Sequence, residues 1–279
     1  MTTSDMTATD LRVDEGYAPV TGGVRMYWRS LGEGGTPLVV VHGGFGDAGM
    51  FGEVLDRLAG GRRVVAVELQ GHGHTADVDR PFSWDAFADD LAALVRHLGL
   101  GPADLMGYSL GGGVVLRTAI RHPEVARRLV VVAAPCRRDG WLPDVLAGMA
   151  GVTSAGFEWM RQSPPYAAYA AVAPDVDAFP ALMDKTGDLI RAPYDWSGEV
   201  PSVTAPVLLV YADCDGVPPA HAAEFFALLG GGLRDPGWDG SGGRPASRLA
   251  ILPGRTHYDV FSAPELAPVV DGFLSGAVR

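Results

Sequence analysis

Ser109 lies in the pentapeptide Gly107-Tyr108-Ser109-Leu110-Gly111, between an expected strand and an expected helix. Gly107 and Gly111 stand two residues before and two residues after the serine. Because glycine has no Cβ atom, it avoids the clashes of a tight turn that raises the serine hydroxyl above the sheet. The N–H groups at the start of the next helix favour an oxyanion that develops beside them. Although this short pattern often occurs by chance, its strand–turn–helix context favours a nucleophilic serine over a structural one.

A serine nucleophile needs a general base, and the base needs a carboxylate that orients it. His257 follows an expected strand at 247–252, so it lies at the carboxyl edge of the sheet, where a base could meet the serine. Asp213 and Asp215 follow the expected strand at 206–211 and reach the same edge. Asp215 is favoured because it lies further out and precedes a Gly-Val-Pro-Pro turn, and Asp213 is the alternative.

Six other histidines compete for the role of base. Three are expected to be structural, namely His97, His122 and His221, and three lie in loops near the same edge, namely His42, His72 and His74. His42 opens the segment His42-Gly43-Gly44-Phe45 and is expected to hold this loop by hydrogen bonds. A glycine-bearing loop here can direct one N–H at a substrate oxygen, and Leu110 N–H would supply the second. Gly44 is the expected first donor and Phe45 the alternative, and a simple turn is the other interpretation.

The composition limits the classes of partner. The 279 residues include 22 basic and 33 acidic side chains, a formal charge of −11 that argues against a nucleic-acid partner. Cys136 and Cys214 match no metal-ligand spacing, so a zinc site and a disulfide framework are not expected. The first twenty residues lack the apolar stretch of a signal peptide, and no apolar run is long enough for a membrane span. The sequence therefore predicts a cytoplasmic protein without a metal or membrane partner.

Apolar runs and helical spacings alternate along the chain and predict a parallel sheet covered by helices on both faces. Strands are expected at 38–41, 63–69, 103–108, 128–134, 206–211 and 247–252, and helices at 47–60, 83–98, 110–122, 219–229 and 264–274. Ser83 is the expected N-cap of the second helix.

Residues 136–204, here called the cap segment, interrupt this alternation with short helical stretches. They are expected to lie over the carboxyl edge of a core formed by residues 16–135 and 205–279, after a mobile tail at 1–15. Candidate substrate contacts, for which simple packing is the alternative, are Phe45, Trp141, Met149, Trp159, Tyr166, Met183 and Tyr258. The Gly-rich stretch 230–244 is expected at the opposite end of the sheet, as a structural or subunit-contacting loop.

From about residue 17 the chain resembles a lid-bearing member of the α/β-hydrolase superfamily. The resemblance rests on the segments HGGFG, ELQGHGHT, GYSLGGG, RHP, YADCDGVPP and LPGRTHY. It implies an eight-stranded core sheet, no required cofactor, a small-molecule pocket between core and lid, and the chain order Ser109, Asp215, His257. Glu68 stands where Asp is commoner and Leu110 where Met or Gln is common, and neither change removes a catalytic group.

The leading hypothesis is hydrolysis of a carboxylic ester or lactone of a largely hydrophobic small molecule through a serine acyl-enzyme. The same fold and residues could instead cleave a carbon–carbon bond in a β-diketone, or act as a cofactor-free lyase or oxygenase. The serine nucleophile argues against the dehalogenase and epoxide-hydrolase branches, which use Asp. A non-enzymatic ligand receptor belongs to a different class and is disfavoured by the intact set of catalytic residue types. A homodimer is compatible with the sequence.

Overall fold

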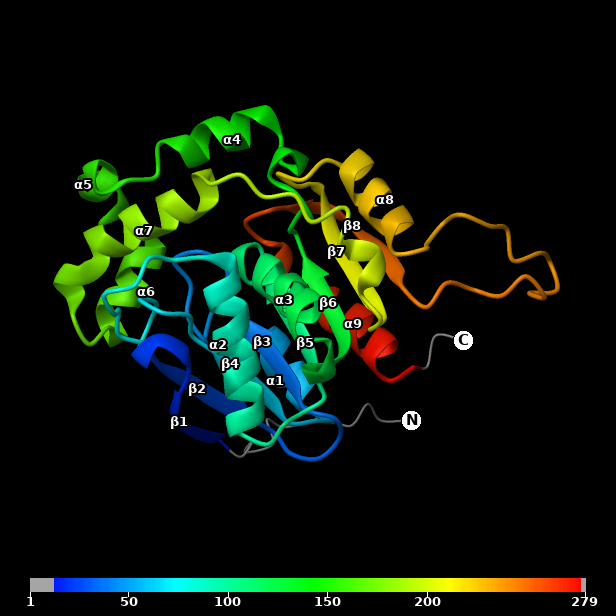
Figure 1. Ribbon diagram of the computed structural model, residues 1–279, viewed down its shortest axis with the longest axis horizontal. Helices are drawn as coiled ribbons and strands as arrows, with labels where there is room; N and C mark the ends of the chain where they lie inside the picture. The colour runs from blue at the N-terminus through cyan, green and yellow to red at the C-terminus, as the bar shows by residue number, and fades with distance from the viewer. Residues whose placement is uncertain (1–12, 277–279) are drawn as a thin grey trace, which may run out of the picture.

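A computed structural model describes residues 13–276, which are built around one eight-stranded sheet (Figure 1). The strands are β1 (Val13–Pro19), β2 (Arg25–Leu31), β3 (Leu38–Val41), β4 (Val64–Val67), β5 (Ala103–Tyr108), β6 (Ala126–Val132), β7 (Val207–Cys214) and β8 (Arg248–Thr256). Their order across the sheet is β1-β2-β4-β3-β5-β6-β7-β8. The pairs β1–β2 and β2–β4 are antiparallel and the other five are parallel, so the expected mostly parallel, eight-stranded α/β fold is confirmed.

Nine α-helices and several short 3-10 helices accompany the strands in the described residues. The α-helices are α1 (Glu53–Ala59), α2 (Trp84–His97), α3 (Leu110–Arg121), α4 (Pro143–Ala150), α5 (Phe157–Met160), α6 (Pro164–Val172), α7 (Phe179–Arg191), α8 (Pro219–Leu228) and α9 (Leu266–Leu274). The 3-10 helices are Thr21–Gly23, Pro123–Val125, Arg138–Gly140, Ser154–Gly156, Val176–Ala178, Val200–Ser202 and Val260–Ser262.

The two faces of the sheet carry separate apolar layers because successive side chains of a strand point to opposite faces. Val39 and Val41 of β3 belong to the layer that contains α2, α3 and α8, whereas Leu38 and Val40 belong to the layer of α1 and α9. All four residues are buried, which explains why the strand reads as a continuous apolar run.

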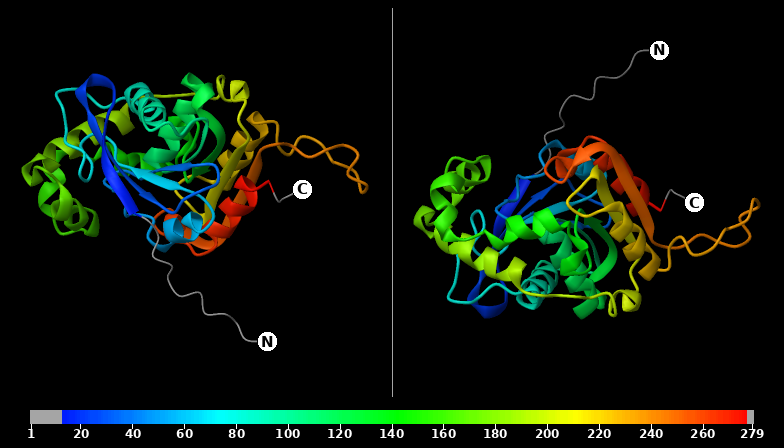
Figure 2. Two further views of the ribbon diagram at one scale, coloured as in Figure 1. Left: turned by 90° about the horizontal axis from the view of Figure 1, so that it is seen from below. Right: turned by 90° about the horizontal axis from the view of Figure 1, so that it is seen from above.

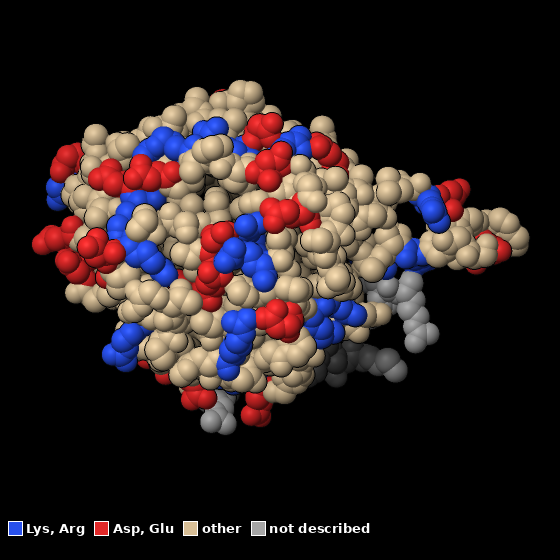
Figure 3. Space-filling model, in the orientation of Figure 1, with Lys and Arg blue, Asp and Glu red and all other residues tan. Residues whose placement is uncertain are grey.

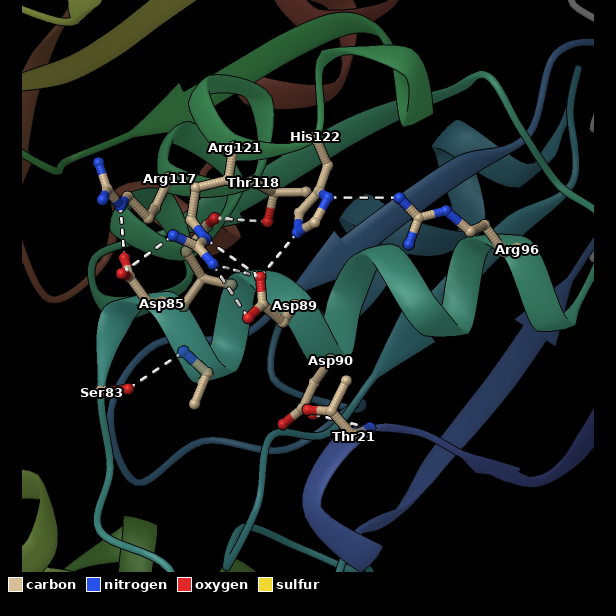
Figure 4. Close-up of polar contacts among 12 residues, drawn as sticks. Thr21, Ser83, Asp85, Asp89, Asp90, Arg96, Arg117, Thr118, Arg121 and His122 are labelled. Carbon is tan, nitrogen blue, oxygen red and sulfur yellow. Dashed lines mark hydrogen bonds and ion pairs between the residues drawn. The ribbon is translucent and has the colours of Figure 1, made fainter.

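Helix α3, which begins directly after Ser109, is fixed along α2 by ion pairs (Figure 4). Arg117 Nε donates to Asp85 Oδ1 at 2.7 Å, and Arg121 Nε donates to Asp89 Oδ1 at 3.0 Å. His122 Nε2 lies 2.7 Å from the same Asp89 oxygen. The expected N-cap of α2 is also present, since Ser83 accepts a hydrogen bond from the N–H of Ala86. The ion pairs hold the second half of α3 along α2.

The N-terminal boundary and one helix start differ from expectation. Residues 1–12 of the expected tail lie outside the described residues, whereas residues 13–15 already pair with β2 as the beginning of β1. The helix expected at 47–60 is wrong in its first half: residues 47–52 form turns, and Gly52 adopts a φ of +51° before α1 begins. That backbone conformation lies in the left-handed region and interrupts a helix.

Two segments extend beyond the sheet and its covering helices. Helices α4 to α7 all lie between β6 and β7, within the cap segment, and form an arc beside the sheet (Figure 1). Residues 229–247, between α8 and β8, form an irregular loop that projects from the molecule in three orientations (Figures 1 and 2). This loop enters β8 at its amino end, the end opposite to the carboxyl edge. No helix between residues 13 and 276 is long and apolar enough to cross a membrane.

Candidate active site

The turn at Ser109 has the strained backbone that its flanking glycines predict. Ser109 adopts φ +52° and ψ −113°, a region that non-glycine residues rarely occupy. A Cβ on Gly107 would lie 2.0 Å from the carbonyl oxygen of Gly111, and a Cβ on Gly111 would lie 2.3 Å from that of Val41. Only glycine therefore allows β5, α3 and β3 to approach so closely around the serine.

His257 and Asp215 complete a hydrogen-bonded chain with this serine. His257 Nε2 lies 3.1 Å from Ser109 Oγ, and His257 Nδ1 lies 2.8 Å from Asp215 Oδ1. The Asp215 side chain is fully buried, and it accepts N–H bonds from Ala212 at 3.2 Å and Val217 at 3.3 Å. These two donors fix both carboxylate oxygens, so the acid faces the imidazole in one orientation.

Asp213, the alternative acid, lies elsewhere. Its side chain is exposed and accepts a hydrogen bond from the N–H of Arg255 at 3.2 Å. Hydrogen bonds from backbone N–H groups, first that of Gly254, hold the pKa of Asp213 below its ordinary value. Asp213 thus joins the end of β7 to β8, and Asp215 is the carboxylate that meets the histidine.

Tyr108 is a supporting residue that the sequence analysis did not single out. Its hydroxyl donates to the carbonyl oxygen of His257 at 2.6 Å, and its ring lies 5.2 Å from the imidazole, centroid to centroid. Burial raises the pKa of the Tyr108 hydroxyl, so it remains a donor at neutral pH. Its place directly before Ser109 on a buried strand was the only available signal, because the contact joins residues 149 positions apart.

The loop after β3 is held by His42, as expected. His42 Nε2 accepts from the N–H of Leu69 at 3.1 Å, and Nδ1 lies 2.7 Å from the Gly43 carbonyl oxygen. Burial lowers the pKa of His42, which favours the neutral ring that these two bonds require. Phe45 has a φ of +60°, and a Cβ on Gly44 would meet no atom within 4 Å, so the backbone here turns tightly beside open space.

Glu68 ties this loop to the segment after β4. Its buried carboxylate accepts N–H bonds from Ala48 at 3.1 Å and from His74 at 2.5 Å. Burial raises the pKa of Glu68, while the bonds from Ala48 and His74 act in the opposite direction. The sequence showed only that Glu68 replaced a commoner Asp. The structure shows that its longer side chain spans two loops.

The beginning of the cap segment touches the same histidine and aspartate. The N–H of Leu142 donates to the carbonyl oxygen of Gly216 at 2.9 Å, one residue after Asp215. The Trp141 ring lies 5.3 Å from that of His257 in an edge-to-face arrangement and is only 8% exposed. Trp141 therefore lies beside the histidine, where a substrate contact was expected.

Phe179, at the start of α7, is the centre of an aromatic group that the sequence analysis missed. Its ring lies 5.8 Å from Phe45, 5.0 Å from Tyr166 and 4.9 Å from Tyr169. Phe45 comes from the loop after β3 and the other three from the cap segment, so this group joins cap and core. Aromatic spacing did not single out Phe179 because it directly precedes a proline in an irregular stretch.

The remaining expected substrate contacts divide by exposure. Met183 is buried and Met149 is partly buried against the larger apolar layer. Tyr258 is 79% exposed, and its ring lies 5.5 Å from that of His257. Trp159 is 77% exposed on α5, so no packing in the structure supports its expected contact with substrate, which stays a prediction.

His72 is a second buried histidine at this edge of the sheet. His72 is fully buried beside His42, and burial lowers its pKa to about 3. Within residues 13–276, no group of three or more His, Cys, Asp or Glu side chains could hold a metal ion.

The family comparison agrees with this geometry. The family model described as "alpha/beta hydrolase fold" matches residues 36–162, from the start of β3 into the cap segment. The serine turn lies within this match, and β7 and β8 continue the same sheet beyond it. The chain has the α/β-hydrolase fold, and its first half matches that family.

Proteins of similar sequence differ in how much of this chain they match. A dihydrolipoyllysine-residue acetyltransferase component of the acetoin cleaving system of Pseudomonas putida is 40% identical over 40% of this chain but only 31% of its own length. The pimeloyl-[acyl-carrier protein] methyl ester esterase of Yersinia enterocolitica is 28% identical over 86% of this chain and 93% of its own. A 2-hydroxymuconate semialdehyde hydrolase from a Pseudomonas species is 34% identical over 41% of this chain and 42% of its own.

A solved structure supports the same α/β-hydrolase fold over nearly the whole chain. The crystal structure of E-2-(acetamidomethylene)succinate hydrolase superimposes with a TM-score of 0.72, covering 95% of this chain and 100% of that chain. Its sequence is 21% identical, so the likeness concerns the fold.

Proposed function

We propose that this protein hydrolyses a carboxylic ester or lactone of a largely hydrophobic small molecule through a serine acyl-enzyme. The observation that carries the proposal is the chain of contacts from Ser109 Oγ to His257 Nε2 at 3.1 Å and from His257 Nδ1 to Asp215 Oδ1 at 2.8 Å. Similarity to a methyl ester esterase over most of both chains supports an ester as the substrate class.

In the proposed reaction, Ser109 Oγ attacks the carbonyl carbon while His257 Nε2 takes the hydroxyl proton. Asp215 holds the imidazole in the tautomer that carries its proton on Nδ1 and stabilises the imidazolium that forms. The imidazolium then gives its proton to the departing alkoxide. Water activated by the same nitrogen attacks the acyl-serine and releases the acid.

The oxyanion of each tetrahedral intermediate needs two N–H donors. We assign these to Leu110, the first residue of α3, and Gly44, in the turn that the hydrogen bonds of His42 and Glu68 hold. The N-terminus of α3 adds its positive dipole end. Loss of one such donor typically lowers kcat by about 10²–10³.

The substrate's apolar part is assigned to the space beside Trp141 and the aromatic group around Phe179. Trp141 lies against His257, and Phe45, which follows the assigned oxyanion donor Gly44, lies against Phe179. Apolar walls with few polar groups are typical of small-molecule sites. The cap segment would exclude water from the acyl-enzyme until the leaving group departs.

The experiment that tests the proposal is hydrolysis of p-nitrophenyl esters of increasing acyl length by the wild type, Ser109→Ala and Ser202→Ala. Ser202 is an exposed serine on a 3-10 helix and serves as the matched control. Ser109→Ala should lose turnover and covalent labelling by a fluorophosphonate while its circular dichroism stays unchanged. Turnover retained in Ser109→Ala would refute the serine mechanism.

A second candidate is hydrolysis of a carbon–carbon bond, which the similarity to 2-hydroxymuconate semialdehyde hydrolase favours. The same panel should therefore include lactones and β-diketones, with products separated by chromatography. Cleavage of a β-diketone into two carbon fragments, with no alcohol released and no activity on esters, would favour this candidate.

A further inference from the structure

The loop at residues 229–247 is long for a connection inside a compact domain. It contains no helix or strand, and it extends away from the sheet in each orientation (Figures 1 and 2). Irregular connections of this length are uncommon and usually have a function of their own. The loop joins α8 to the amino end of β8, so it lies far from Ser109 and plays no part in the proposed reaction.

The loop carries two exposed apolar side chains. Trp238 is 101% exposed and Leu233 is 65% exposed. A fully exposed tryptophan presents a large apolar surface to water, and tryptophan is among the residues most enriched at the centres of protein interfaces. Asp235 and Asp239 flank Trp238, whereas the basic residues Arg234 and Arg244 stand further from it in sequence. The tip of the loop is therefore an apolar ring with acidic neighbours.

A groove of matching character lies at the base of the same loop. It has a volume of about 460 Å³, and its walls come from β8, α9 and the amino ends of β6 and β7. The apolar walls include Pro206, Leu249, Val269 and Phe273, and the charged lining residues are Arg128 and Arg248. β8 is also the last strand of the sheet, so no further strand covers this edge.

The two arginines of the groove are held by backbone carbonyl oxygens. Arg128 Nη1 donates to the carbonyl oxygens of Phe273 and Leu274 at 2.6 Å, and Arg248 Nη1 donates to backbone carbonyls of Pro245 and Ser247. The charge of Arg128 also acts on Asp104, a carboxylate that forms an ion pair with Arg127. In a protein of net charge −11, this is a basic apolar groove facing solvent.

We propose that the loop of one copy of this protein inserts Trp238 into the groove of a second copy, and that the exchange is reciprocal. The groove offers apolar walls for the indole and two arginines for Asp235 and Asp239. Because the loop projects away from the body of the molecule, we take the loop of a second copy as the occupant of the groove (Figure 3). A two-fold axis beside β8 would place the loop of each copy in the groove of the other. This is the closed, self-complementary contact typical of homodimers.

The arrangement predicts a dimer that leaves both active sites open. The groove lies at the amino ends of the strands, whereas Ser109, Asp215 and His257 lie at their carboxyl ends. Substitutions in the loop should therefore change the mass of the particle without changing ester hydrolysis. This separation also means that the dimer and the proposed function can fail independently.

The test is light scattering coupled to size exclusion, and sedimentation equilibrium, over about 1–100 μM protein, the range expected for a modest interface. The wild type should form a dimer. Trp238→Ala should raise the dissociation constant at least about 30-fold, the loss typical of a central tryptophan. The matched control is Trp159→Ala, since Trp159 is 77% exposed on the cap segment and should leave the mass unchanged.

Charge exchange gives a second, independent measurement. Asp239→Arg and Arg248→Asp should each weaken the dimer, and the combined variant should regain part of the lost affinity, because both residues then meet an opposite charge again. Circular dichroism and ester hydrolysis report whether each variant folds. A monomeric wild type at every concentration, a dimer unaffected by Trp238→Ala, or a Trp238 ring that proves to be buried in its own chain would each overturn the proposal.

Discussion

Asp215→Asn is the substitution that best tests the proposed catalytic geometry. In the wild type both carboxylate oxygens accept backbone N–H bonds, Oδ2 from Ala212 and Oδ1 from Val217, and Oδ1 also faces His257 Nδ1. An amide has one acceptor oxygen and one NH₂ donor, so it cannot satisfy all of these donors.

The two orientations of the amide have different consequences. If its oxygen faces His257, its NH₂ meets the N–H of Ala212, and a buried donor left without an acceptor costs about 1–3 kcal/mol. If the amide flips, its oxygen satisfies Ala212 and its NH₂ faces His257 Nδ1. The imidazole then carries its proton on Nε2, the nitrogen that must accept a proton from Ser109. In this orientation the N–H of Val217 loses its acceptor instead, so each orientation leaves one buried backbone donor unsatisfied. A triad with this wrong tautomer loses roughly 10⁴ in kcat.

The assay compares kcat for an activated ester in the wild type, Asp215→Asn and Asp213→Asn. Asp213 is the matched control because it lies two residues away, is exposed, and bonds to the N–H of Arg255 rather than to the histidine. Its variant should keep kcat within about twofold, as expected for an exposed substitution away from the site. The reasoning is refuted if Asp215→Asn stays within tenfold of the wild type, or if both variants lose activity equally.

Two further predictions concern stability and the cap segment. The pKa of His72 is about 3 in the folded protein, below the ordinary value of 6.5, so the unfolded chain binds the proton first as the pH falls. The stability that the neutral ring contributes above pH 6.5 is therefore lost between pH 6.5 and 3, at up to about 1.4 kcal/mol per pH unit. His72→Asn should therefore show a shallower decline in urea-unfolding free energy between pH 6 and 4, and parallel curves would contradict this. Lys185 Nζ lies 2.6 Å from Asp77 Oδ2, and this ion pair joins α7 to the core. Lys185→Met should therefore raise KM a few-fold at unchanged kcat and lower the free energy of unfolding by up to about 1 kcal/mol. A tenfold fall in kcat would contradict this role.

The strands at the centre of the sheet could be predicted because they are buried on both faces and therefore read as continuous apolar runs. The strand expected at 103–108 has the same bounds as β5, and the helix expected at 83–98 differs from α2 by one residue at each end. The first two strands, β1 and β2, were not located. Their residues mix charged and apolar types, because this antiparallel part of the sheet exposes one side of β1 to solvent.

The candidate catalytic residues were accessible to sequence reasoning because each follows a strand, and parallel strands end at one edge. Ser109, Asp215 and His257 meet for that reason alone. The residues that support them were not accessible. Tyr108 and Phe179 act through contacts between segments that are distant in the sequence. Trp141 is buried and Trp159 is exposed, and this difference depends on how the cap segment folds over the core.

The bond between Leu142 and Gly216 limits how the cap segment can move. Leu142 is attached to the turn that holds Asp215, and its neighbour Trp141 lies against His257. A displacement that carried these two residues outward would pull the acid and the base away from the serine. A cap that opens with the catalytic geometry intact must therefore pivot beyond Leu142, so that α4 to α7 travel while residues 136–142 stay with the core. Admission of substrate and alignment of the catalytic residues would then be mechanically separate, and the site would be ready for reaction before the cap closes.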